Sequence, residues 1–355
     1  MGASVALAAR RRGDTVVGWD IDPNALAAAA AREALEPTSS LEDAVRDADL
    51  VVVAAPIAAL PAQVEAVLAA PGDATVTDVG STKASVVAAA GGSPRFVGGH
   101  PICGSESRGA ENASAGLFEN ATWFLTPVAQ TDADRHRLVH GFITDVGATP
   151  VAIDADAHDR LVAMTSHVPH VLANIVANQT GEARVEGHEP LAHAGGSLRD
   201  MTRIAGANPR IWVDIFLDNA QAIRGALAEH RRRIEQVESA LEQGDAGYLA
   251  RWIGEASTNR RRMLEREYPD PGSLQRLRVH ISDRPGVLAA STQALGAERI
   301  NSEDFELHHM SPERGGTLQV LVEGEGEAQR AAKLLEGQGY SVVVSPVLEA
   351  EDTVE

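Results

Sequence analysis

Two kinds of apolar pattern alternate along the first 150 residues of the chain. Short apolar runs, of the kind that buried strands carry, lie between alanine-rich stretches with helical spacing. The predicted strands are Thr15–Trp19, Leu50–Ala54, Thr75–Thr77, Phe96–Val97 and Thr122–Leu125. The predicted helices are Pro23–Leu35, Leu60–Ala69, Lys83–Ala90 and Asp132–Val146. This alternation is typical of parallel strands joined by helical crossovers, and it predicts a doubly wound α/β domain over residues 1–153.

The pattern changes at about Asp154, where strand signals end and helical periodicity takes over. Turn signals at Gly195-Gly196 and Asn208-Pro209 separate three helical stretches: Leu161–Ala183, Ile211–Leu241 and Tyr248–Glu267. We therefore expect an all-helical domain over residues 154–268. After a linker at Pro269–Gly272, residues 274–348 show the order strand, helix, strand, strand, helix, strand, which predicts a ferredoxin-like domain. The acidic tail Glu349–Glu355 is expected to fray.

Composition narrows the classes of partner. With 50 acidic against 31 basic residues the formal net charge is −19, and such a surface repels nucleic acid and anionic membranes. No apolar run reaches the ~20 residues that a membrane span needs. The first apolar stretch precedes Arg10–Arg12, which is the reverse of a signal peptide. Cys103 is the only cysteine, so no internal disulfide can form. We expect a cytoplasmic protein that binds neither nucleic acid nor membranes.

Doubly wound sheets bind their ligands beyond the carboxyl ends of the strands. Here those ends lead into four loops: Asp20–Pro23, Ala55–Ile57, Asp78–Lys83 and Gly98–Gly109. A dinucleotide site needs a glycine-rich turn before the first helix, and Gly2 stands where the third glycine of that turn would fall. The first strand and the first two glycines are missing, so we expect a truncated or misassigned start.

An acidic strand end completes the cofactor prediction. Asp20 lies where a carboxylate would bind the adenosine ribose and repel a 2′-phosphate, which favours NAD over NADP. An ordinary acidic turn is the alternative for Asp20. The residues expected to bind the cofactor are Gly2, Asp20, Ala55, Pro56 and Ser81.

The segment RFVGGHPICGSE, residues 95–106, places a histidine just past a predicted strand end. Glycines and a proline flank His100 and fix its loop. A histidine that titrates near neutral pH can take the proton of an alcohol as its hydride leaves. Ser81, at a neighbouring strand end, can hydrogen-bond both the substrate hydroxyl and the imidazole. A lone histidine is more often structural, but the company of Ser81 favours catalysis.

Polar motifs also mark the predicted helical domain. The segment TSHVPH at 165–170 lies within a predicted helix, and GGSLRDMTRIA follows at 195–205. Arg199 and Arg203 are four residues apart and therefore share a helix face. Guanidinium groups pair bidentately with carboxylates, so the two arginines suit a dicarboxylate substrate. The alternative is a solvated pair bound to Asp200.

Five segments resemble the motifs of prephenate dehydrogenases, and they occur in that family's order between about Met1 and Tyr268. Along the chain they are DVGSTK, GGHPICGSE, SHVPH, GGSLRDMTRIA and NPRIWVDIFLDN. The resemblance implies a Rossmann-like dinucleotide domain followed by a helical dimerisation domain, hence a homodimer. It implies that the protein oxidises prephenate with NAD to 4-hydroxyphenylpyruvate, with loss of CO2, in tyrosine biosynthesis.

The resemblance also implies roles for individual residues. His100 would take the hydroxyl proton or bind that hydroxyl, with Ser81 assisting beside the nicotinamide. Arg203 would hold the pyruvyl carboxylate. The rest of the substrate pocket would be formed by His170, Ser105, Glu106, Arg199 and Trp212. The family often has Thr at the Ser105 position and Lys at the Arg199 position, which leaves substrate preference open but not the reaction class.

Three weaker candidates stand beside these. His158-Asp159 matches a family pattern and is either an orienting pair near the site or a helix cap. Cys103 as a nucleophile activated by His100 is disfavoured, because hydride transfer needs no thiolate. His308 and His309 are adjacent in a predicted strand and point to opposite faces, so no shared metal is expected.

The segment ISDRPGVL, residues 281–288, ends a strand and opens a helix in the third domain. With the strand order it resembles an ACT domain, a small amino-acid-sensing module. The resemblance implies an effector site, in which Gly286 lets the backbone come close and the helix N-terminus suits a carboxylate. The effector would be tyrosine or another aromatic amino acid, bound by Asp283, Pro285, Gly286 and Val287. A dimerisation module that has lost effector binding is the alternative.

Three other functions stay open at this point. Arogenate dehydrogenase performs the same chemistry on an amino acid instead of a keto acid. A catalytically impaired amino-acid sensor is suggested by the missing first strand, although the presence of Ser81, His100 and Arg203 together argues against it. Dehydrogenases of the 3-hydroxyacid type usually have a catalytic lysine on the first helix after the strand domain, and none occurs here.

Overall fold

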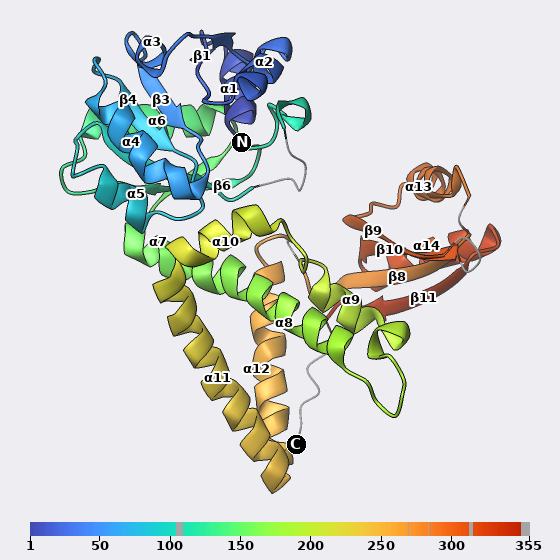
Figure 1. The fold of residues 1–355 in the computed structure, drawn as a ribbon. Helices are drawn as coiled ribbons and strands as arrows, with labels where there is room; N and C mark the ends of the chain where they lie inside the picture. The colour runs from blue at the N-terminus through green and yellow to red at the C-terminus, as the bar shows by residue number, and fades with distance from the viewer. Residues whose placement is uncertain (104–108, 269, 283, 312–314, 349–355) are drawn as a thin grey trace. The chain divides into compact units, whose positions relative to one another are not determined.

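The computed structural model describes residues 1–103, 109–268, 270–282, 284–311 and 315–348 (Figure 1). The chain forms two compact units, Met1–Arg233 and Ile234–Glu355. Residue 269 of the predicted linker and the whole tail from Glu349 lie outside the described residues. In the described part of the chain, no helix is both long and apolar enough to cross a membrane.

The first unit begins with a sheet between two layers of helices (Figure 1). The strands lie in the order β3 (Leu50–Val53), β4 (Thr75–Asp78), β5 (Phe96–Pro101), β6 (Thr122–Thr126) and β7 (Thr149–Ala152). A separate parallel pair joins β1 (Val17–Gly18) to β2 (Glu36–Pro37). The helices are α1 (Gly2–Arg12), α2 (Pro23–Ala31), α3 (Leu41–Val45), α4 (Leu60–Ala69), α5 (Ala84–Ala89) and α6 (Ala133–Asp145), with short 3-10 turns at η1 (Ile57–Ala59) and η2 (Ala110–Asn112).

The core of this part lies on both faces of the sheet. On one face, α1 and α6 pack against β5 and β6 through residues such as Val5, Phe142 and Trp123. On the other face, α4 and α5 pack against β4 and β5, and Phe96 belongs to this second layer. Its neighbour Val97 belongs to the first, since successive strand residues point to opposite faces. Burial on both faces explains why these strands read as continuous apolar runs.

Two sequence predictions about the sheet are wrong. The strands were expected to be parallel throughout, but β5 and β6 are antiparallel. Antiparallel neighbours need no helical crossover, and between β5 and β6 the described residues contain only the short turn η2. The same pairing extends β5 to Pro101 and sets His100 opposite Phe124. His100 therefore lies within a strand instead of in the loop after it.

The helical part of the first unit positions several predicted site residues. It contains α7 (Ala155–Val162), the π-helical turn η3 (Ala163–His167), α8 (Val168–Glu182), η4 (Pro190–His193), α9 (Gly196–Thr202), α10 (Pro209–Asp218) and the start of α11 (Ala220–Gln243). Both predicted turns are confirmed: Gly195 precedes α9, and the Asn208 side chain caps α10 by accepting the Arg210 N–H. One continuous helix over Ile211–Leu241 is wrong, because the helix breaks at Asn219.

The second unit continues α11 and adds α12 (Ala246–Leu264) before an α/β part. The elements of that part are β8 (Leu274–Ile281), α13 (Val287–Ala297), β9 (Asp304–Ser311), β10 (Gly315–Glu323), α14 (Glu325–Gly337) and β11 (Ser341–Pro346), in the predicted order. The four strands form an antiparallel sheet of order β11-β8-β10-β9. Buried residues of the strands and helices, among them Leu277, Val320 and Leu335, form its core.

Candidate active site

Three side chains are hydrogen-bonded in series, from Asp159 through His158 to His100. The Nδ1 atom of His100 lies 2.9 Å from Nε2 of His158, and Nδ1 of His158 lies 2.8 Å from Oδ1 of Asp159. His158 is fully buried and Asp159 is 5% exposed, whereas His100 stays partly exposed. Of the two sequence interpretations of His158-Asp159, the structure supports the orienting pair, because the imidazole of His158 contacts that of His100.

Asp159 also ties this chain to the loop that carries Ser81. Its Oδ1 and Oδ2 atoms accept the backbone N–H groups of Lys83 and Ala84, at 2.8 and 2.9 Å. Burial alone would raise the pKa of Asp159, but the hydrogen bonds from His158 and from these two amides outweigh it, and the pKa falls below its ordinary value. Asp159 is therefore an anion that holds the Ser81 loop and His158 together.

A buried ion pair supports His100 from behind. The Lys83 ammonium group pairs with the Asp78 carboxylate and donates to the Gly99 carbonyl at 2.8 Å, and both side chains are fully buried. The Asp78 carboxylate also accepts the N–H groups of Gly80 and Gly99, at 2.8 and 2.9 Å. These contacts join the end of β4, which leads into the Ser81 loop, to the part of β5 that carries His100.

Gly99 has no room for a side chain beside this ion pair. A Cβ atom at Gly99 would lie 2.6 Å from the Asp78 carbonyl oxygen and 2.9 Å from Oγ1 of Thr77. Backbone atoms cannot move aside cheaply, so the close approach of β5 to β4 requires glycine. The glycine that the sequence places before His100 thus serves the packing beneath the site.

Loss of the Lys83 ammonium group should destabilise the protein. Lys83→Met leaves the Asp78 carboxylate buried without its cation, and breaking a buried pair in this way costs about 3–5 kcal/mol. We expect chemical denaturation to show a decrease of this size in the free energy of unfolding, with Lys333→Met as a control on the exposed face of α14. A change no larger than that of the control would contradict the role of the pair.

The electrostatic setting keeps His100 neutral. Burial is the main cause, and the positive charge of Lys83 adds to it, so that the pKa of His100 lies well below its ordinary value. The titration near neutral pH that the sequence analysis expected of His100 is therefore wrong. An imidazole with such a pKa is unprotonated at neutral pH. His100 can therefore accept a proton there, as a general base must.

A second group of aromatic side chains continues from Asp159 into the helical part. The Asn219 side-chain amide donates to the Asp159 carbonyl oxygen at 2.8 Å and lies 3.1 Å from Nδ1 of His167. The π-helical turn η3 carries His167, and such turns are frequent at functional sites. His170 stacks on Trp212, with ring centroids 3.6 Å apart, and hydrogen-bonds to the backbone of Ile204.

The structure thus brings several predicted residues together and adds two that were missed. His170, Trp212 and the neighbourhood of Arg203 are linked to each other, since Ile204 directly follows Arg203. His167 and Asn219 connect this group to Asp159, and the sequence analysis assigned neither a role. Their motifs, SHVPH and IFLDN, were the available signal.

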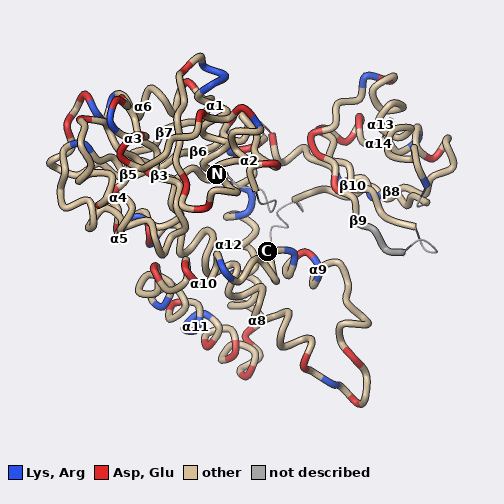
Figure 2. The backbone as a smooth tube through the Cα atoms, turned by 45° about the horizontal axis from the view of Figure 1, so that its top comes forward, with Lys and Arg blue, Asp and Glu red and all other residues tan. Residues whose placement is uncertain are grey.

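The two predicted carboxylate-binding arginines lie at α9. Arg199 lies in the helix and Arg203 is its C-cap residue, and both are exposed. Figure 2 shows basic positions of the backbone in blue at α9. Their exposure agrees with the solvated alternative that the sequence left open, although the described residues show no salt bridge from either arginine to Asp200. Ser105 and Glu106, predicted to line the same pocket, lie outside the described residues.

The predicted cofactor residues lie at the starts and ends of adjacent elements. Gly2 begins α1, and a Cβ atom there would lie 3.0 Å from Cβ of Ala54 at the end of β3. Close packing of helix on strand is the role of the third glycine in a dinucleotide turn. Asp20 is exposed after β1, with Oδ1 accepting the Asp22 N–H, while Ala55 and Pro56 follow β3. These residues fit the adenine half of a dinucleotide.

The remaining candidates from the sequence are Cys103, a metal site and the turn at Gly286. Burial raises the pKa of the Cys103 thiol to about 11, so a nucleophilic thiolate is disfavoured. In the described part of the chain, no group of three or more His, Cys, Asp or Glu residues could hold a metal ion. Gly286 precedes α13 with a φ of 88°, followed by buried Val287, while Asp283 lies outside the described residues.

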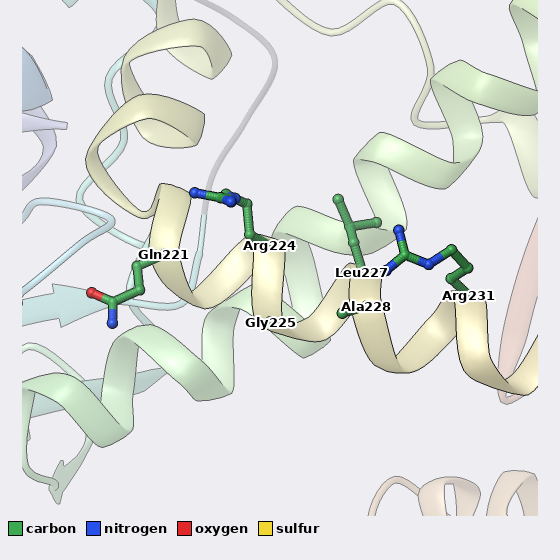
Figure 3. Close-up of a pocket in the computed structure, with 6 residues that line it drawn as sticks. All are labelled: Gln221, Arg224, Gly225, Leu227, Ala228 and Arg231. Atoms are coloured by element: carbon green, nitrogen blue, oxygen red, sulfur yellow. The ribbon is translucent and has the colours of Figure 1, made fainter.

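One pocket runs along a single helix. Gln221, Arg224, Gly225, Leu227, Ala228 and Arg231, all of α11, line a space of about 500 Å³ (Figure 3). None of the residues predicted from the sequence to bind substrate or cofactor lines it. The candidate site is therefore defined by its hydrogen-bonded side chains.

Comparisons with known proteins converge on one family. Residues 5–152 match the model "Prephenate dehydrogenase, nucleotide-binding domain" and residues 154–255 match "Prephenate dehydrogenase, dimerization domain". A prephenate dehydrogenase of Bacillus subtilis is 32% identical over 350 residues, which cover 95% of this chain and 94% of the relative.

Two solved structures are also similar. One is prephenate dehydrogenase from Aquifex aeolicus in complex with hydroxyphenyl propionate and NAD+, with a TM-score of 0.68 and 29% identity over 74% of this chain and 94% of that one. The other is arogenate dehydrogenase from Synechocystis, with a TM-score of 0.67 and 25% identity over 73% of this chain and 94% of that one.

Proposed function

The chain belongs to the prephenate dehydrogenase family, and from this we propose that it catalyses the NAD-dependent oxidative decarboxylation of prephenate to 4-hydroxyphenylpyruvate. The observation that carries the proposal is the hydrogen-bonded chain from Asp159 through His158 to His100, next to the Ser81 loop. A neutral, partly exposed imidazole backed by an anion is what removal of a hydroxyl proton requires.

The proposed reaction requires one hydride transfer, one proton transfer and the loss of CO2. When NAD is bound, its nicotinamide supplies the acceptor for the hydride. His100 takes the proton of the ring hydroxyl, and Ser81 assists by hydrogen-bonding to that hydroxyl. Loss of CO2 makes the ring aromatic, which is strongly downhill. The task of the site is therefore to orient the reacting groups and to handle one proton.

We further propose how the substrate is held. Arg203 pairs with the pyruvyl carboxylate, and Arg199 adds positive charge at the same helix. His170 supports the pocket wall with Trp212, on which it stacks. Ser105 and Glu106 would complete the pocket. NAD would be held by Gly2, Asp20, Ala55, Pro56 and Ser81, and the acidic Asp20 favours NAD over NADP.

Formation of NADH with prephenate tests the function. We expect a larger kcat/KM with prephenate than with arogenate, because the relative that covers almost the whole chain is named for prephenate. The Synechocystis relative keeps arogenate dehydrogenase as the second candidate. A larger kcat/KM with arogenate would establish that alternative, and absence of NADH formation with both substrates would exclude the reaction.

For the second unit we infer a ferredoxin-like ACT domain that binds an aromatic amino acid. The inference is supported by the element order and by the left-handed Gly286 before α13, which lets a ligand approach the helix start. The effector would be tyrosine, bound around Asp283, Pro285, Gly286 and Val287. We also propose a homodimer, as the matched dimerization domain suggests, and a cytoplasmic location, where a free Cys103 would persist.

Tyrosine should stabilise the protein and inhibit it. At a concentration of 100 times Kd, a ligand that binds only the folded state adds about 2.7 kcal/mol of stability. We expect a concentration-dependent rise of the Tm and a fall of activity with tyrosine, and neither with alanine. If no amino acid shifts the Tm or the rate, the unit is a dimerisation module without an effector.

A further inference from the structure

We propose that His158, held by Asp159, is a positioning residue that fixes the tautomer of His100, with the proton on Nδ1 and the basic lone pair on Nε2. The proposal deepens the proposed function, since it names the atom that receives the proton of the substrate. It follows from the direction of each hydrogen bond in the chain described above.

The first step concerns His158 and Asp159. An ionised carboxylate can only accept hydrogen bonds. Asp159 already accepts two backbone N–H groups, and its low pKa keeps it ionised. Its contact with His158, at 2.8 Å, must therefore be donated by the imidazole. This places a proton on Nδ1 of His158.

The second step concerns the contact between the two imidazoles. A neutral His158 with its proton on Nδ1 has a lone pair on Nε2. A hydrogen bond between two ring nitrogens needs one donor and one acceptor. Nε2 of His158 then accepts, and Nδ1 of His100, 2.9 Å away, must donate. The other ring nitrogen of His100 keeps its lone pair.

Packing prevents the rings from exchanging these roles by turning over. The ring of His158 lies edge-on to His100 and to Phe124, with centroids 5.1 and 5.4 Å apart. Phe124 lies opposite His100 across the β5–β6 pair. The same strand pairing that carries His100 therefore also supports the ring that orients it.

The hydrogen bond between the rings is kept when His100 takes up the proton. The hydroxyl proton of the substrate ends on Nε2, and the resulting imidazolium keeps its Nδ1–H bond to His158. The anion Asp159 lies one imidazole behind and holds His158 in its orientation. In serine proteases an anion orients the base by direct contact, whereas here a second imidazole lies between them.

Nuclear magnetic resonance of the wild-type protein tests the tautomer without substrate. The full chain would be labelled with nitrogen-15 histidine, and the His100 signals identified as those absent from His100→Asn. At a pH above 6.5, we expect a protonated nitrogen at Nδ1 and an unprotonated one at Nε2. A proton on Nε2 would overturn the proposal. Because no turnover is measured, the result does not depend on whether prephenate is the substrate.

Two variants test the positioning role in turnover. His158→Phe keeps a ring but accepts no hydrogen bond, and we expect kcat to fall about 100-fold with little change in KM, as for a misplaced catalytic group. His158→Gln, which retains an acceptor near Nε2, should recover part of the loss. His140→Phe on the exposed face of α6 is the matched control. A kcat for His158→Phe equal to that of the control, or a loss in KM alone, would refute the positioning role.

Discussion

His100→Asn should lower kcat by about 10²–10⁴-fold, the usual contribution of a general base, while KM for prephenate changes little. Asparagine places an amide N–H close to the position of Nδ1, so it can still donate to Nε2 of His158. It has no basic nitrogen at the position of Nε2. The variant thus keeps the buried hydrogen bond and loses the proton acceptor, which separates catalysis from folding.

The measurement is NADH formation at saturating prephenate, with His140→Asn as the control for removal of an exposed histidine. Unchanged Tm values would show that the fold is intact. His100→Asn at the full wild-type rate would mean that another group, or water, takes the proton.

Arg203→Ala should raise KM for prephenate about 100-fold. The reason is that loss of a bidentate, charge-assisted contact to a carboxylate lowers the affinity by about this factor. We expect kcat to change by only a few-fold, because the pyruvyl carboxylate is remote from the ring hydroxyl where His100 acts. Arg203 is exposed and is the C-cap residue of α9, directly before Ile204, whose backbone contacts His170.

Arg137→Ala removes an exposed arginine from α6 and is the control. Arg203→Lys should restore only part of the affinity, because an ammonium group cannot pair bidentately. If the KM of Arg203→Ala matched that of the control, the carboxylate would have to be held by Arg199 or by residues outside the described part of the chain.

Much of the fold could be predicted from local patterns of residues in this single sequence. Strands buried on both faces give continuous apolar runs, so β3 and β4 were predicted to within a residue or two. The helix bounds of α4 agree with the prediction, because Pro61 at its start and the polar turn after Ala69 limit it on both sides. His100 and Ser81 were found because glycines and strand ends surround them.

The features that could not be predicted from the sequence depend on contacts between segments that are far apart along the chain. The antiparallel direction of β6 is set by pairing with β5, and no local pattern encodes it. The link from His158 to His100 spans 58 positions, and Asn219 contacts residues 52 and 60 positions away. His158-Asp159 therefore remained undecided between an orienting pair and a helix cap until the two segments were seen together.

The burial of Lys83 has a practical consequence for labelling. The chain has only two lysines, and one of them is fully enclosed behind His100, while Lys333 is exposed on α14. Of the two lysine side chains, reagents that acylate amines should therefore label only that of Lys333, in the second unit, and not the one behind His100. A dye placed in this way would report amino-acid binding to that unit in an enzyme that still turns over.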